Sequence, residues 1–187
     1  MLKKIVEWPN KSLKKQAEPI FKLDDDVNQL AANLVDTCNI MFGAGLAAPQ
    51  IGVSKRMVVI KPSSFGAENP EPSSINEEYL IMINPSVEVS GEKIEWIEAC
   101  LSLPETQGKV ERSSEAQITY MNLDGDTRTF KAAWPFAGGL QHEIDHLDGV
   151  LYIDRQHKKK RWSTLYKLKR KRRKQEIQER RARRMRQ

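Results

Sequence analysis

Residues 141–149, Gln-His-Glu-Ile-Asp-His-Leu-Asp-Gly, decide the fold, because they place an H-E-x-x-H pattern on an apolar helix. Apolar residues recur at helical spacing before and within this stretch, at Ala137, Leu140, Ile144 and Leu147. They predict a helix over residues 136–148, with Gly149 just beyond its end. Such an apolar stripe must pack against other elements, so this helix is expected at the centre of the fold.

The surrounding sequence predicts mostly strands. A first helix is expected over residues 25–41, because the acidic cluster at 24–26 suits a helix N-terminus. A polar loop rich in Pro, Ser and Glu spans residues 62–78. Strands are predicted near residues 56–61, 79–83, 86–97, 100–103, 115–122 and 127–133. The predicted class is therefore α+β, with mixed or antiparallel sheets surrounding the central helix.

The central helix carries the candidate chemistry. His142 and His146 lie four residues apart on one helix face, so both imidazoles can bind one metal ion. Glu143 projects beside them, where its carboxylate can reach a water bound to that metal. H-E-x-x-H also occurs by chance, and two such histidines can form an ordinary surface pair.

A hydrolytic metal usually has three protein ligands and one open position. Tyr152 stands where the metzincin pattern requires a third histidine. The glutamates after the motif, Glu176 and Glu179, lie in a strongly basic tail, and Asp154 lies where the helix should have ended. A cysteine thiolate binds Zn²⁺, Fe²⁺, Co²⁺ or Ni²⁺, so Cys100 is the best third ligand by elimination.

The other cysteine is predicted to be structural. Cys38 belongs to an apolar helical stripe with Val27, Leu30, Leu34 and Met41, which is typical of a core position. A disulfide with Cys100 is not expected, because no feature of the sequence indicates secretion.

Three separated segments resemble the motifs of one family, the peptide deformylases. Residues 43–50 (GAGLAAPQ) resemble G-x-G-L-A-A-x-Q, residues 98–102 (EACLS) resemble E-G-C-L-S, and residues 141–149 resemble Q-H-E-x-D-H-L-x-G. The motifs occur in the family's order, and the likeness covers about residues 1–154. Ala99 replaces the usual glycine, which indicates extended backbone or a slightly displaced ligand loop.

The resemblance implies removal of the N-formyl group from the N-terminal methionine of newly synthesised polypeptides, with release of formate. Cys100, His142 and His146 would hold one divalent metal ion. The family usually uses iron (Fe²⁺), and Zn²⁺, Ni²⁺ and Co²⁺ are alternatives that ligand type does not separate. A metal-bound hydroxide would attack the formyl carbon, with Glu143 as general base and then general acid.

The resemblance also implies roles around the metal. The side-chain amide of Gln50 and the backbone N–H of Leu101 would bind the oxyanion. The implied substrate-binding residues are Gly43, Ala44, Gly45 and Glu98. Gly43 also suits the C-terminus of the first helix, and Glu98 is expected to orient the ligand loop. Family members often have bulkier residues at Gly138 and Gly139, so a wider substrate pocket is expected.

Charge divides the chain in two. Residues 155–187 hold 17 of the 31 Lys and Arg residues and two acids, a net charge of +15, which leaves −9 on residues 1–154. We expect a catalytic domain at 1–154 and a basic C-terminal extension, helical or disordered, at 155–187. The extension is either solvated or folded on the acidic body, or it binds RNA phosphates. Some deformylases resemble the latter case, with a basic C-terminal helix that docks on the ribosome.

Other classes fit less well. A metalloprotease lacks its downstream ligand, and a nucleic-acid-binding protein with a structural metal would need a fourth ligand. The sequence contains no apolar run long enough for a membrane span, and the N-terminus lacks the apolar stretch of a signal peptide. The expected location is the cytoplasm, and the resemblance implies a monomer.

Overall fold

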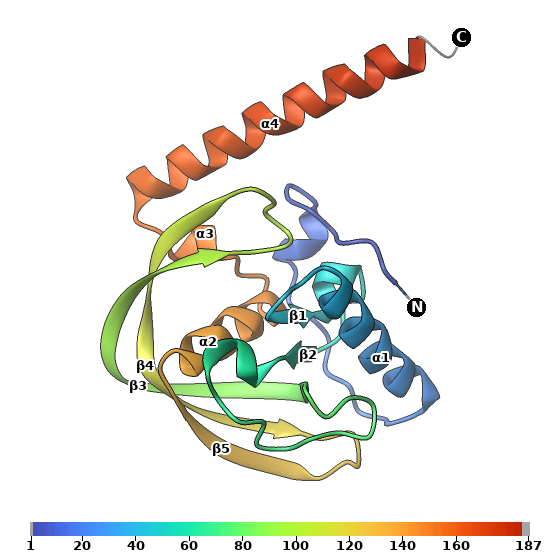
Figure 1. Cartoon of the computed structure of the whole chain (residues 1–187), viewed down its shortest axis with the longest axis vertical. Helices are drawn as coiled ribbons and strands as arrows, with labels where there is room; N and C mark the ends of the chain where they lie inside the picture. The colour runs from blue at the N-terminus through green and yellow to red at the C-terminus, as the bar shows by residue number, and fades with distance from the viewer. Residues whose placement is uncertain (1, 185–187) are drawn as a thin grey trace.

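The computed structural model describes residues 2–184 and has an α+β fold, as predicted (Figure 1). Its strands form one antiparallel sheet in the order β1-β2-β3-β4-β5. The strands are β1 (Gly45–Ala47), β2 (Met57–Ile60), β3 (Leu80–Ala99), β4 (Gln107–Met121) and β5 (Thr127–Ala133). The sheet curves around α2 (Phe136–Leu147), so the predicted central helix is confirmed.

The sequence of α2 explains its central position. All of its residues are buried, and its apolar face packs on residues from β2, β3, β4 and β5. The predicted face is confirmed, since Ala137, Leu140, Ile144 and Leu147 are each at most 2% exposed. Burial of the three large side chains among them, Leu140, Ile144 and Leu147, contributes about 1.5–3 kcal/mol each.

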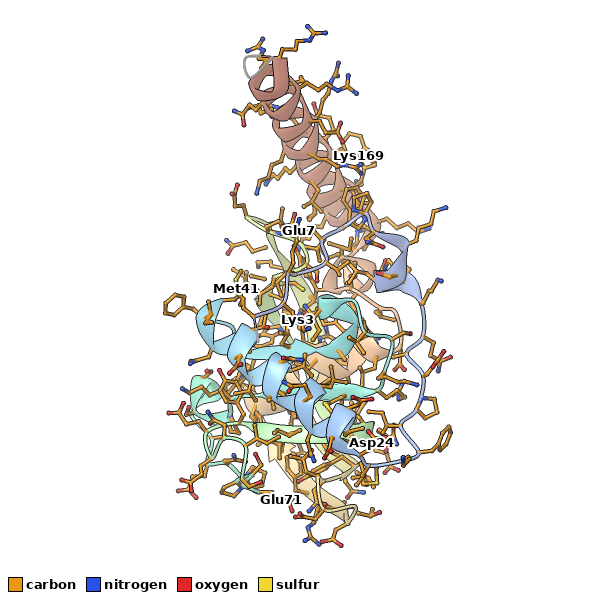
Figure 2. The ribbon with its side chains drawn as sticks, turned by 90° about the vertical axis from the view of Figure 1, so that its right-hand side faces the viewer. Lys3, Glu7, Asp24, Met41, Glu71 and Lys169 are labelled. Carbon is orange, nitrogen blue, oxygen red and sulfur yellow. The ribbon has the colours of Figure 1, made fainter. Side chains whose placement is uncertain are left out.

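Helix α1 (Asp25–Ile40) lies on the other side of β1 and β2 and covers a second apolar cluster that contains Cys38 (Figure 1). Asp24 caps its N-terminus by accepting a hydrogen bond from the Val27 N–H, and Figure 2 shows Asp24 where α1 begins. At the C-terminus the Gly43 N–H donates to the Cys38 carbonyl at 2.9 Å. Phe42, and not Gly43, takes the left-handed conformation there, with φ of 53°.

The structure differs from the strand predictions in three places. Segments 79–83 and 86–97 form one strand, β3, with an irregularity between Ile83 and Ser86. Residues 100–103 are a turn, closed by a hydrogen bond from the Leu103 N–H to the Cys100 carbonyl. The strand expected at 115–122 begins already at Gln107, so β3 and β4 form a long hairpin with that turn at its end.

Three short 3-10 helices and two C-terminal helices complete the part of the chain that the structure describes. They are η1 (Lys11–Lys14), η2 (Ala48–Ile51), η3 (Pro62–Phe65), α3 (Tyr152–Arg155) and α4 (Lys158–Arg184). Figure 1 shows α4 projecting from the body of the protein. Within residues 2–184, none of the helices combines the length and hydropathy that a membrane crossing requires.

Most of the basic extension is helical, since α4 covers residues 158–184, and residues 185–187 lie outside the described part. Leu165 and Leu168 at its start pack against an apolar cluster that includes Leu13, Leu103 and Tyr152. Trp162 and Tyr166 also lie on this first part of α4. These two rings stack on each other but are 70% and 55% exposed.

Candidate metal centre

Cys100, His142 and His146 converge on one point. One ligand atom of each residue lies within 4.8 Å of the others, and Cys100 Sγ is 3.3 Å from His146 Nε2. The two histidines are one turn apart on α2, and Cys100 opens the turn between β3 and β4. Ala99, the last residue of β3, pairs with Gln107 and so has extended backbone, as one alternative predicted.

Hydrogen bonds fix the orientation of His142. Its Nδ1 lies 2.6 Å from Glu98 Oε2, which leaves Nε2 as the atom that can bind a metal. Burial by itself would raise the pKa of Glu98, but hydrogen bonds from His142 and Arg112 lower that pKa to about 2. Glu98 is therefore an anion that holds the imidazole in place.

Arg112, on β4, links the carboxylate of Glu98 to that of Asp145 on α2. It donates to both oxygens of Glu98, from Nε at 2.8 Å and from Nη2 at 3.0 Å, and its Nη1 donates to Asp145 at 2.5 Å. Arg155 also donates to Asp145. Breaking one buried partner from such a set typically costs about 3–5 kcal/mol. Arg112, Asp145 and Arg155 were not predicted from the sequence. Of the three, only Asp145 could have been suspected, because it lies between the two histidines of the motif.

Glu143 points into the same space. The carboxylate is buried, and its Oε2 has no hydrogen-bond partner among the described residues. Burial raises the pKa of Glu143 to about 7. A carboxylate with this pKa can both accept and return a proton near neutral pH.

The donor set fits a divalent metal. Burial lowers the pKa of His146 well below its usual range, so its ring is neutral and can offer a lone pair. A thiolate with two imidazoles suits first-row transition metals such as Fe²⁺ or Zn²⁺. Cys38 has a different environment: it is fully buried, and burial raises its thiol pKa to about 12, in agreement with the predicted core role.

Gln50 lies against the ligand loop. Its Oε1 accepts from the Ala47 N–H at 2.8 Å, and its Nε2 lies 3.4 Å from Cys100 Sγ and 3.3 Å from Ser102 Oγ. The side chain is 2% exposed, so these contacts hold the amide beside the metal ligands.

One pocket of about 900 Å³ is lined by most of the candidate site residues. Its lining includes Gly43, Ala44, Gly45, Gln50, Glu98, Cys100, Leu101, His142 and Glu143. His146 is not part of the lining and is 2% exposed. Met41, at the end of α1, and Glu7, in the N-terminal segment, border the pocket and are labelled in Figure 2.

Aromatic rings lie beside Gly138 and Gly139, the two positions at which a wider pocket is expected. A Cβ on Gly138 would lie 2.8 Å from the Trp134 ring and 3.1 Å from the Trp96 ring. A Cβ on Gly139 would lie 2.6 Å from Cε1 of Phe65. Aromatic rings from other segments therefore occupy the space that the two glycines leave.

Gly45 permits the approach of Glu143, which yields a first prediction. A Cβ at Gly45 would lie 2.6 Å from Glu143 Oε1, so Gly45→Ala must displace the carboxylate. A displacement of about 1 Å can lower turnover on the order of a hundredfold. We expect a fall of that order in kcat on a short substrate, with bound metal and thermal midpoint unchanged. Loss of metal in parallel with activity would contradict this reason.

The chain is similar to known proteins over most of its length. A family model described as polypeptide deformylase matches residues 2–162. A peptide deformylase of Desulforudis audaxviator is 39% identical over 166 residues, which cover 88% of this chain and 96% of that protein. A solved peptide deformylase from Ehrlichia chaffeensis has a TM-score of 0.82 at 32% identity, and covers 94% of this chain and 99% of its own. The crystal structure of one from Legionella pneumophila has a TM-score of 0.81 at 31% identity, with 94% and 98% covered.

Proposed function

This chain belongs to the peptide deformylase family, and on that premise we propose how its residues remove the formyl group from formylated nascent peptides. Cys100, His142 and His146 form the metal-binding group. When bound there, a divalent metal supplies Lewis-acid activation of water and of the formyl oxygen. We propose Fe²⁺ as the metal, because the family usually has iron. The thiolate and the two imidazoles do not themselves distinguish Fe²⁺ from Zn²⁺, Ni²⁺ or Co²⁺.

Glu143 is proposed to move the proton. It would take a proton from the attacking water and return it to the amine that leaves with the peptide. The observation that carries this role is the buried Oε2 without a hydrogen-bond partner in the described structure, beside the metal ligands. A buried polar atom without a hydrogen-bond partner lowers the stability of the fold. Such an atom is therefore typical of a group that is kept for its function.

Gln50 and Leu101 are proposed to stabilise the oxyanion. The Gln50 amide is held by the Ala47 N–H, so its NH₂ group is directed toward Cys100 and Ser102 before substrate binds. A preset donor needs no reorganisation when charge develops on the formyl oxygen. The Leu101 N–H directly follows the ligand Cys100 in the chain and is proposed as the second donor.

Gly43, Ala44, Gly45 and Glu98 are proposed to shape the substrate site. β1 is the first strand in the sheet order, so one of its edges is free to pair with an extended peptide. Gly43, Ala44 and Gly45 line the pocket at this edge, and small residues there let a peptide backbone approach closely. Glu98 contributes indirectly, through the position of His142.

A direct test separates this function from a metalloprotease. The protein would be incubated with formyl-Met-Ala-Ser and, separately, with unblocked Met-Ala-Ser. We expect formate and free Met-Ala-Ser from the first peptide and no change in the second. Cleavage of peptide bonds in either peptide, without formate, would indicate the protease instead.

Helix α4 is proposed to dock the enzyme on ribosomal RNA. Residues 155–187 carry a net charge of +15, and most side chains of α4 are exposed. Figure 2 shows Lys169 on this projecting helix. Thr164 and Lys167, also on α4, border the active-site pocket, so docking through the helix would bring the pocket close to emerging chains. Phosphate contacts of this kind are salt-dependent and largely independent of sequence.

Truncation tests this docking. Removal of residues 172–187 deletes eight basic residues and two acids but keeps the buried Leu168 and the Lys171–Glu105 ion pair. We expect unchanged hydrolysis of a short formyl peptide and weaker cosedimentation with ribosomes. The slope of log K against log salt should fall by about 0.7–0.9 for each phosphate that the shortened helix no longer neutralises. Unchanged cosedimentation would favour a solvated extension.

A cut after residue 157 is a poorer test, because it also removes Leu165 and Leu168 from the apolar cluster on the body. We propose residues 1–154 as the catalytic domain and 155–187 as the docking extension, in a monomer that works in the cytoplasm. On this division, activity and ribosome binding should respond to separate substitutions.

A further inference from the structure

Two glycines on the first turns of α2 face aromatic rings from outside the helix. Three carbons of the Phe65 ring lie no more than 3.0 Å from where a Gly139 Cβ would stand. That spacing is too short for a real side chain, so Phe65 and a side chain at Gly139 exclude each other. The ring of Phe65 therefore takes the place of a residue on the pocket-facing side of α2.

Packing and backbone hydrogen bonds fix the position of Phe65. It ends η3, whose Pro62 is buried, and its ring packs on Phe136 with centroids 6.0 Å apart. Backbone hydrogen bonds from Ser64 to Lys61 and from Ala67 to Pro62 close the segment. The ring is half-buried and lines the same pocket as the metal ligands Cys100 and His142.

Trp96 borders the pocket near the other glycine. Its ring meets Trp134 edge-on, with centroids 4.7 Å apart, and would contact a Cβ on Gly138. Its Nε1 donates to Glu98 Oε1 at 2.8 Å, so the ring is fixed to the carboxylate that orients His142. Trp96 and Phe65 thus give this part of the pocket two aromatic walls.

The geometry of the substrate places its first side chain near these walls. The methionine Cα is two bonds from the formyl carbon, which must lie close to Glu143 and the metal ligands. The side chain therefore falls within the same pocket, where the rings of Phe65 and Trp96 offer apolar surface. A thioether makes favourable contacts with aromatic rings.

We propose that Phe65 is a specificity-determining residue, whose ring seated on Gly139 limits the size of the first substrate side chain. The inference rests on the proposed function, since it concerns the same pocket and substrate. It makes Phe65 and Gly139 a coupled pair: removal of the ring opens space that a helix side chain can refill.

The test compares four variants with two peptides, formyl-Met-Ala-Ser and formyl-Trp-Ala-Ser. Phe65→Ala should lower the ratio of kcat/KM for the Met over the Trp peptide by about tenfold or more, since one pocket contact changes discrimination by 10–200-fold. Gly139→Ile alone should lose activity and thermal stability, because its side chain meets the Phe65 ring. The double variant Phe65→Ala/Gly139→Ile should recover both and restore the preference for methionine.

Phe130→Ala is the matched control. Phe130 also packs on Phe136, with centroids 6.1 Å apart, but it does not line the pocket. Its loss should lower stability and leave the substrate ratio unchanged. An unchanged ratio in Phe65→Ala, or effects of the two substitutions that simply add, would overturn the inference. Formate release by the unmodified protein separates this failure from a failure of the proposed function, which would abolish turnover of both peptides.

Discussion

Glu143→Gln is expected to lower kcat for formyl-Met-Ala-Ser by about 100- to 10,000-fold, the contribution typical of general acid–base catalysis. Glutamine has nearly the same shape but cannot take up and return a proton at neutral pH. Metal content, measured on the same sample, should remain that of the unmodified protein, because the metal-binding group does not include Glu143.

Stability gives this substitution a second readout. Glu143 is buried, and its Oε2 lacks a partner in the described part of the chain. Burial of an unpaired group is unfavourable, so its replacement by an uncharged side chain should not lower the free energy of unfolding. Glu143→Ala should likewise keep the metal and lose turnover. Full activity in either variant would refute the proposed proton transfer.

Cys100→Ala is expected to lose metal as well as activity. The thiolate is one of the three groups that meet within 4.8 Å, and two imidazoles alone bind a transition metal far more weakly. Metal analysis after dialysis should show little bound metal, and kcat should fall to near background. Added metal at high concentration should restore metal occupancy before it restores rate.

Cys38→Ala is the matched control for this substitution. Cys38 is the other cysteine, fully buried in the cluster beneath α1, and its Sγ lies 3.2 Å from the Gly43 carbonyl oxygen. Its truncation should cost roughly 1–3 kcal/mol of stability through the missing atom and the small cavity. Bound metal and kcat should remain unchanged. Equal metal loss in both variants would point to misfolding and not to ligation by Cys100.

Much of the fold follows from local pattern. The apolar positions of α2 recur with helical period, and every residue of that helix is buried. Asp24 acts as the expected N-cap of α1. The first half of β4 was not predicted, because it is rich in polar residues and such residues usually point to solvent and not into the core. Here Arg112 is 2% exposed, since it pairs with Glu98 and Asp145 inside the protein.

The turn at residues 100–103 resembles a short strand in sequence, because the apolar Leu101 and Leu103 flank the polar Ser102. A backbone hydrogen bond from the Leu103 N–H to the Cys100 carbonyl defines the turn, and such a bond cannot be predicted from the types of these residues. The turn has functional weight, because it ends β3 with Cys100 beside the histidines.

The metal-binding group could be predicted in two different ways. The histidine pair follows from helix geometry alone, because residues four apart share a face. Cys100 lies 46 positions from His146 in the sequence, so its contact with that histidine depends on the β3–β4 hairpin. Cys100 could be predicted as a ligand only by elimination of other residues and by resemblance to the family. The sequence gives no indication of a role for Phe65, because this residue lies in a segment predicted as a polar loop. Its ring lies against Gly139, and that contact is visible only in the structure.

The most direct test of the central claim is formate release from formyl-Met-Ala-Ser under anaerobic conditions, with metal analysis of the same sample. We expect one formate for each peptide consumed, about one divalent metal per chain, and loss of turnover when a chelator removes that metal. A protein that holds its metal and releases no formate, or releases formate equally well without any metal, would contradict the account.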